Sequence, residues 1–254
     1  MTTRIIINAD DLGRSAAVND AAFALMDRGL VTSATIIATG DSLGDVARRC
    51  RDYPHCSFGT HLFLDEFQPL TDLSAFENLL LPDGRLREDA RTYAFTRSVR
   101  NALLEEWVAQ VEHVRSVGIP VSHLDSHHHV HTIPVAFGML KALQQRTGVR
   151  KVRISLNCYE KPVPLMLLAK KSLFNFSLRR FVRTTTHFAP FGIFHALMEQ
   201  GRLPRPSTIE LMVHPGASTY MKAPAYYEDE LVKLGGRWRE YLPWDYRFIS
   251  YDDL

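Results

Sequence analysis

The chain has 254 residues, of which 46% are hydrophobic and 23% are charged, a composition typical of a globular protein. Its 30 basic and 28 acidic residues leave a formal charge of +2, which excludes a general electrostatic attraction to nucleic acid. Three cysteines without a CxxC pair, no signal-like start and no apolar run of about 18 residues argue against secretion and membrane spans, so we expect a cytoplasmic protein.

Short apolar runs alternate along the chain with segments of helical periodicity. In chain order, strands are predicted at 5–9, 31–38, 57–64, 121–125, 152–156, 184–187, 208–213 and 247–250. Helices are predicted at 16–28, 43–51, 98–117, 135–146, 193–200 and 226–234. About seven βα units without a linker predict one domain over 1–254, with a parallel sheet covered by helices. A barrel holds that many units, and a doubly wound open sheet is the alternative.

Two segments fall outside the βα pattern. Residues 65–95 are irregular, with a turn signal at Pro82-Asp83-Gly84. Residues 157–183 form an insertion that mixes apolar and basic side chains between Met166 and Arg183. We expect that insertion to be a helical lid packed on the barrel. Contact with a membrane surface or a lipid-linked glycan is the alternative.

Unusual polar residues lie at the carboxyl ends of five predicted strands, where parallel α/β folds build their sites. They are Asn8-Ala9-Asp10-Asp11, Gly59-Thr60-His61, Asp125-Ser126-His127, Arg153 and His214-Pro215-Gly216. This convergence predicts one functional site at that edge of the sheet.

The segment 123–131 holds five of the 11 histidines, which indicates a divalent metal. His127, His129 and His131 share a face if the segment is extended, whereas His127 and His131 share one if it is helical. The spacing therefore does not select the ligands. The histidines that do not bind metal, His128 among them, orient ligands, contact substrate or form hydrogen bonds.

Each remaining candidate has two readings. Asp10 and Asp11 divide metal binding and base catalysis between them, or they cap a turn and pair with a lysine. His61 suits a core position when taken alone, but its place at a strand end favours a metal ligand. His214 is a general acid or an ordinary turn histidine. Arg153 holds a carboxylate in the site or lies on the surface like its neighbours.

Taken together, these motifs resemble the YdjC-like carbohydrate deacetylases, which include chitooligosaccharide deacetylases. The resemblance rests on Asn8 to Gly13, Val31 to Ser33, Gly59 to His61, His123 to His131 and Met212 to Gly216, in the family's order. It implies a distorted (β/α) barrel of the glycoside hydrolase/deacetylase type. It implies that Asp11, His61 and His127 bind the metal and that Asp10 is the catalytic base. A looser analogy makes His214 the acid and Arg153 the partner of the base.

The expected reaction is metal-assisted hydrolysis of an N-acetyl group on an amino sugar, with release of acetate. The family resemblance implies Mg²⁺, whereas two imidazoles and one carboxylate favour Zn²⁺ or another transition metal. The alternatives are a phosphoesterase or amidohydrolase on a similar barrel, or a non-catalytic sugar- or metal-binding protein. The expected partner is an acetylated amino sugar rather than nucleic acid, and relatives suggest a homodimer.

Overall fold

The fold is that of a computed structural model, which describes residues 2–87, 89–222 and 224–254. Within these described residues, seven strands form one sheet in which every pairing between strands is parallel. They are β1 (Thr3–Leu12), β2 (Ser33–Ile36), β3 (Ser57–Leu62), β4 (Leu124–Ser126), β5 (His187–Pro190), β6 (Thr208–Val213) and β7 (Tyr246–Phe248). The strand order is β4-β3-β2-β1-β6-β5, and β7 pairs with the first residues of β1. The prediction of a distorted (β/α) barrel with about seven parallel strands is confirmed, and the strands form a curled half-barrel.

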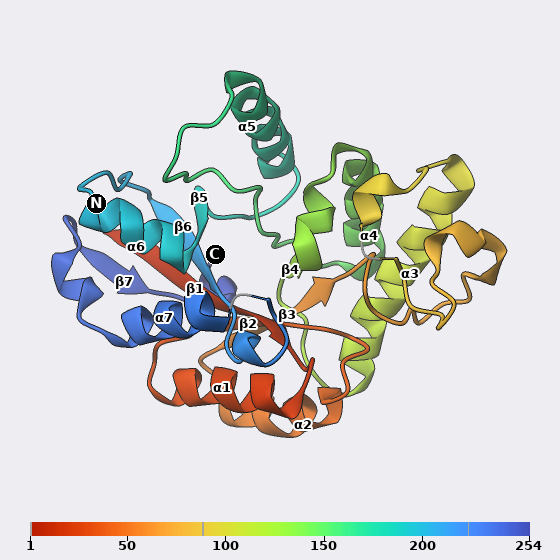
Figure 1. The fold of residues 1–254 in the computed structure, drawn as a ribbon, viewed down its shortest axis with the longest axis horizontal. Coiled ribbons are helices and arrows are strands. Elements are labelled where there is room, and N and C mark those ends of the chain that lie inside the picture. The colour runs from red at the N-terminus through yellow and green to blue at the C-terminus, as the bar shows by residue number, and fades with distance from the viewer. Residues whose placement is uncertain (1, 88, 223) are drawn as a thin grey trace.

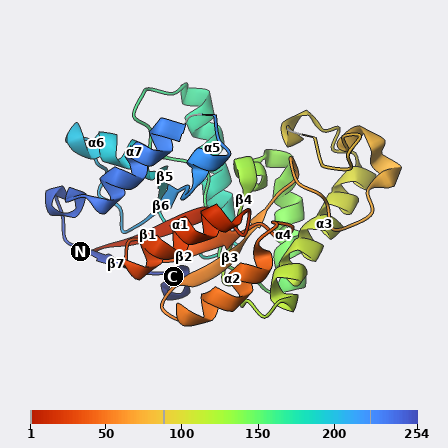
Figure 2. The ribbon, with the colours of Figure 1, turned by 60° about the horizontal axis from the view of Figure 1, so that its bottom comes forward.

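In the part of the chain that the structure describes, seven α-helices cover or flank this sheet (Figure 1). They are α1 (Ala16–Asp27), α2 (Leu43–Arg49), α3 (Arg97–Ser116), α4 (Phe137–Thr147), α5 (Leu165–Arg179), α6 (Phe191–Glu199) and α7 (Pro224–Gly235). Figure 2 shows α1 and α2 along one side of the sheet and α3 and α4 together beyond β4. No described helix is both long and apolar enough to cross a bilayer.

The central strand β1 follows from its sequence. Ile5, Ile6 and Ile7 are all fully buried, as expected for a strand covered on both faces. Helix boundaries follow capping rules: the hydroxyl of Ser15 accepts a hydrogen bond from the backbone of Val18 at the start of α1. α4 is capped by Gly148, whose φ of 74° lies in the left-handed region that favours glycine.

The predicted strand at 152–156 is wrong. Only Lys151 and Val152 form isolated bridges, to Arg183 and Leu124. Beyond them, side chains replace a neighbouring strand: the amide of Asn175 makes two hydrogen bonds with the backbone of Ser155, at 2.9 and 3.0 Å. The predicted strand at 184–187 is also displaced, because β5 begins only at residue 187. The barrel is therefore distorted between β4 and β5.

The two unusual segments differ in kind. Residues 65–87 and 89–95 contain only short 3₁₀ turns and one antiparallel bridge, between Leu80 and Leu86. The insertion at 157–183 carries the whole of α5, which stands off from the sheet in Figure 1.

Candidate active site

A β-bulge places two adjacent carboxylates in the same site. Neighbouring residues of a regular strand point to opposite faces. The pairing of β1 with β2 shifts register between Ala9 and Leu12, and Asp11 has a φ of 63°. A bulge of this kind re-aims side chains. As a result the carboxylate of Asp10 meets Arg153 while that of Asp11 meets His61.

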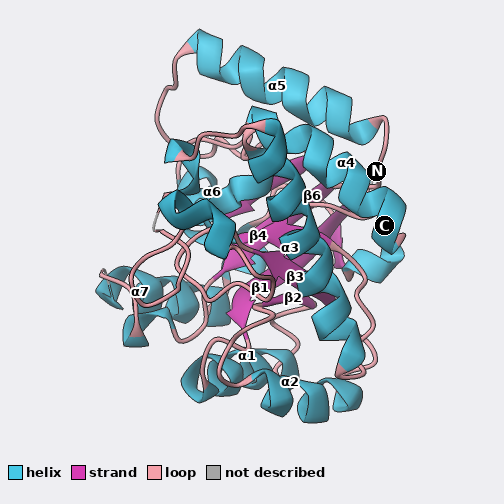
Figure 3. Ribbon diagram, turned by 90° about the vertical axis from the view of Figure 1, so that its right-hand side faces the viewer, coloured by secondary structure: helices cyan, strands magenta, loops and turns pink. Residues whose placement is uncertain are grey.

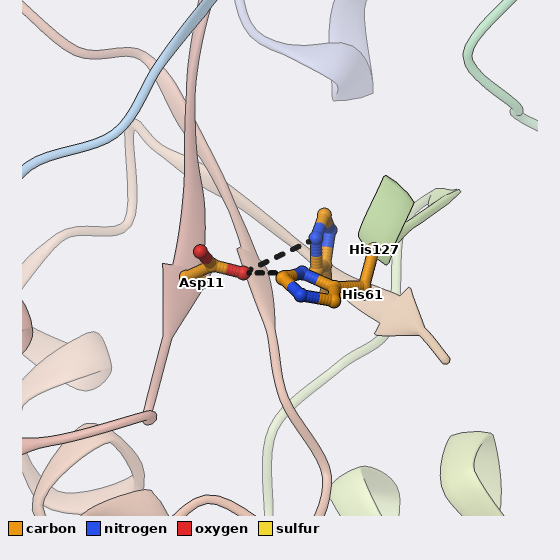
Figure 4. Close-up of side chains that lie close together, drawn as sticks. All are labelled: Asp11, His61 and His127. Carbon is orange, nitrogen blue, oxygen red and sulfur yellow. Dashed lines mark hydrogen bonds and ion pairs between the residues drawn. The ribbon is translucent and has the colours of Figure 1, made fainter. Parts of the chain in front are cut away.

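The three predicted metal ligands lie together (Figure 4). Asp11 Oδ1 is 3.3 Å from His61 Nε2 and 3.1 Å from His127 Nδ1. One ligand atom from each residue lies within 4.8 Å of the others, and all three residues are buried. They come from the ends of β1 and β3 and from the turn after β4. One carboxylate and two imidazoles form the donor set of a three-ligand divalent metal site.

The charges in this group also suit a cation. Burial opposes ionisation of Asp11, but the imidazoles of His127 and His61 outweigh it and hold its pKa well below 3.8. Burial likewise disfavours protonated His127, yet Asp11 and Glu66 raise the pKa of that imidazole to about 10. The buried carboxylate therefore attracts positive charge to the place where the ligand atoms converge.

Asp125 orients His61. Its Oδ1 lies 2.7 Å from His61 Nδ1, and its Oδ2 accepts a hydrogen bond from Thr35 at 3.0 Å. With Nδ1 held by this carboxylate, Nε2 of His61 faces Asp11. A carboxylate behind a ligating histidine fixes its tautomer and raises its basicity. Asp125 lies in register with His61 across β3 and β4, but it was not predicted to have this orienting role.

Two other groupings of possible ligands overlap with this one. The first, Asp10, His61 and Asp125, already holds a cation, because Arg153 lies 2.6 Å from Asp10 and 2.7 Å from Asp125. The second combines Glu66 and His127 with His128, whose side chain is 43% exposed. The first grouping is as buried as Asp11, His61 and His127 but is occupied by the guanidinium of Arg153, and the second grouping is only partly buried.

Arg153 is fully buried and joins three carboxylates. Its two Nη atoms donate to both oxygens of Asp10 at 2.6 and 2.7 Å. Its Nη1 also lies 2.7 Å from Asp125, and its Nε donates to Glu210 at 2.7 Å. Burial favours a protonated Asp10, but the Arg153 guanidinium outweighs it and holds the pKa of Asp10 well below 3.8. Asp10 is therefore ionised and fixed in orientation, and the prediction that Arg153 lies in the site agrees with this arrangement.

Glu210 was not predicted as a site residue. It lies within β6, and an acidic residue in an otherwise buried strand is a sequence signal for a functional role. Glu210 also accepts a hydrogen bond from the hydroxyl of Tyr251. Burial raises the pKa of Glu210 to about 7, although Arg153 opposes the shift.

His214 follows β6 directly and lines the same cavity as Asp10 and His61. This cavity has a volume of about 640 Å³. The ring of His214 packs edge-on against Tyr227, with 5.5 Å between centroids. Burial lowers the pKa of His214 below 6.5, although Asp10 and Asp11 oppose the shift. The structure thus brings all six predicted site residues to one cavity or its immediate wall.

The other histidines of the cluster do not share one face. The segment after His127 is neither extended nor helical, because His128 and His129 have φ values of 48° and 55°. His131 lies in the core, bonded to the hydroxyl of Ser126 at 2.5 Å and to the backbone oxygen of Arg153 at 3.1 Å. Burial lowers the pKa of His131 to about 4, as expected for a neutral core histidine.

Two further residues near Asp11 were not predicted as part of the metal group. The hydroxyl of Tyr220 donates to Asp11 Oδ2 at 2.6 Å, which leaves Oδ1 facing the imidazoles. Glu66 extends from the irregular segment 65–95 to within 3.3 Å of His127 Nε2. Neither position carries a local sequence pattern, since loop geometry alone brings both side chains to the site.

Comparison with known proteins gives relatives in sequence and in structure. A carbohydrate deacetylase of Geobacillus stearothermophilus is 35% identical over 150 residues, which cover 58% of this chain and 59% of that protein. A chitooligosaccharide deacetylase of Citrobacter koseri is 28% identical over 241 residues, covering 92% of this chain and 90% of the relative.

A crystal structure of an Enterococcus faecalis V583 protein, named for cellobiose-phosphate cleavage, shares the fold. Its TM-score is 0.79 at 20% identity, and the match covers 100% of this chain and 99% of that one. A family model described as YdjC-like protein matches residues 4–244. The chain therefore belongs to the YdjC-like protein family.

Proposed function

We propose that this protein is a metal-dependent carbohydrate N-deacetylase, which hydrolyses an acetamido group and releases acetate. One observation carries the proposal: the ionised carboxylate of Asp10 stands beside, but outside, the group formed by Asp11, His61 and His127. A site with a metal-binding group and a separate base suits hydrolysis of an amide. The names of the Geobacillus and Citrobacter relatives support a sugar substrate.

Asp11, His61 and His127 would hold the metal in this proposal. When bound there, a divalent ion supplies a Lewis acid for the amide oxygen and lowers the pKa of a coordinated water. The donor set of two imidazoles and one carboxylate is typical of catalytic zinc, whereas Mg²⁺ prefers oxygen ligands. We therefore favour Zn²⁺ or another transition metal over Mg²⁺. Metal analysis of protein purified without chelator distinguishes them.

Asp10 is the proposed base. Its Oδ1 accepts hydrogen bonds from Asn8 and Arg153, whereas Oδ2 accepts one from Arg153 alone. A carboxylate has about four lone-pair positions, so one remains for the proton of an attacking water. Arg153 keeps Asp10 ionised and fixes its direction. Arg153 is thus a positioning residue, which acts on the reaction through Asp10.

His214 is the proposed general acid. It lines the cavity shared with Asp10 and His61, and Tyr227 fixes the plane of its ring. A protonated His214 would give its proton to the departing sugar amine as the C–N bond breaks, while Asp10 accepts the proton of the attacking water. Because burial lowers its pKa, His214 in its protonated form is a stronger acid than an exposed histidine.

The decisive experiment screens acetate release from acetylated mono- and oligosaccharides of glucosamine, with the protein stripped of metal and then reloaded. We expect turnover only after metal is returned, and none in His61→Ala, which removes a ligand atom. His55→Ala is the matched control, because His55 is exposed and belongs to no described group of possible metal ligands. Turnover in the stripped protein, or in His61→Ala, that equals the turnover of the reloaded wild type would contradict the metal role.

A further inference from the structure

Helix α5 has two apolar faces, of which only one is covered. The inner face packs on the barrel: Leu178 is buried, Asn175 bonds to Ser155, and the ring of Phe174 lies 5.7 Å from that of Phe137. This apolar inner face explains why α5 packs on the barrel. It does not account for the apolar residues on the other side of α5.

The outer face of α5 is apolar as well. Met166, Leu173 and Phe176 follow a spacing of seven and three residues, which places them in one stripe. Their exposed fractions are 70%, 66% and 55%. Six of the ten large apolar side chains that are exposed in the described part of the chain lie between Leu165 and Phe181. Figure 3 shows α5 at the outer edge of the molecule, with no other helix on its far side.

The charged side chains of the segment that contains this stripe are all basic. Residues 161–198 contain no aspartate or glutamate. The same segment carries six basic residues: Lys161, Lys170, Lys171, Arg179, Arg180 and Arg183. Among the described residues, none of these six makes an ion pair with a carboxylate side chain. Arg180 lies over the ring of Phe176, at 4.6 Å, so cation and apolar surface are adjacent.

An exposed apolar stripe flanked by basic residues indicates which kind of partner can cover α5. A second copy that met α5 through a twofold axis would place the basic residues against themselves, without an acidic residue in the segment to pair with them. A bilayer that contains anionic phospholipids covers apolar side chains and pairs with lysine and arginine at once. We propose that the outer face of α5 docks on an anionic phospholipid surface, with Met166, Leu173 and Phe176 in the headgroup boundary.

Vesicle sedimentation tests this docking. The whole protein is mixed with phosphatidylcholine vesicles that either contain or lack phosphatidylglycerol, at low and at high salt. We expect binding only to the anionic vesicles and a marked loss at high salt, since salt screens exposed charges. Lys170→Gln/Arg180→Gln should weaken binding about fivefold for each basic residue replaced. Leu173→Gln/Phe176→Gln should abolish it.

Val232→Gln is the matched control, because Val232 is 74% exposed on α7, a different helix. It should bind vesicles like the wild type. Acetate release from a soluble sugar should be unchanged in all these variants, which separates loss of docking from loss of folding or catalysis. Wild-type protein that does not bind anionic vesicles at low salt would overturn the proposal. So would a wild-type dimer that Leu173→Gln/Phe176→Gln converts to a monomer, since the partner would then be a second copy.

Discussion

Replacing Arg153 by methionine should destabilise the protein more than any surface charge change. The guanidinium is fully buried and lies 2.6–2.7 Å from Asp10, Asp125 and Glu210. Methionine has a similar length but leaves the carboxylate of Asp10 and the carboxyl groups of Asp125 and Glu210 buried without the guanidinium. Breaking a buried ion pair by removing one partner costs about 3–5 kcal/mol. For a chain of this size, that loss lowers Tm by roughly 10 °C.

Urea unfolding at pH 7 measures this effect, with Arg146→Met as the matched control. Arg146 pairs with Glu105 on the surface, where an ion pair contributes about 0–1 kcal/mol. The double variant Asp10→Asn/Arg153→Met removes one of the stranded charges, so it should recover part of the loss. A cost for Arg153→Met below about 1 kcal/mol would refute the electrostatic account of this cluster.

Three other predictions follow from the same contacts. Asp125→Asn should weaken metal binding about 10- to 100-fold in a titration, because His61 loses its orienting carboxylate; unchanged affinity would contradict that role. Burial lowers the pKa of His123 to about 3 and that of His131 to about 4, so between about pH 6.5 and 4 the unfolded chain binds more protons at these two imidazoles. The free energy of unfolding should therefore decrease as the pH is lowered, by about 1.4 kcal/mol per pH unit for each of the two histidines. His123→Phe should reduce this slope, measured by urea unfolding at several pH values. Deacetylation should decline as pH rises through a pKa below 6.5, the proton on His214 being lost; His214→Gln should remove that limb of the rate profile.

The sequence predicted the edge of the sheet where the site lies, for a physical reason. Parallel strands bring their carboxyl ends together, so Asp11, His61 and His127 converge although they are far apart in sequence. The apolar runs that define β1 and β6 are buried on both faces, which makes their ends easy to recognise.

Other features depend on contacts between distant segments. Residues 153–156 are β-branched and apolar in part, yet Asn175 and His131 take the hydrogen bonds that a neighbouring strand would make. The bulge at Asp11 was equally invisible, because a φ of 63° at an aspartate has no local sequence signature. Glu66 and Tyr220 reach the site through loops, whose paths the periodicity of apolar residues does not describe.

The division of labour between the adjacent carboxylates Asp10 and Asp11 is the central claim. Metal content and the rate of acetate release, measured on the same samples of Asp10→Asn, test it most directly. Asp52→Asn serves as the exposed control. We predict that Asp10→Asn retains the metal of the wild type and loses about 100- to 10,000-fold in turnover, the contribution of a general base. Full turnover in Asp10→Asn, or loss of its metal, would contradict the assignment of Asp10 as the base and Asp11 as the ligand.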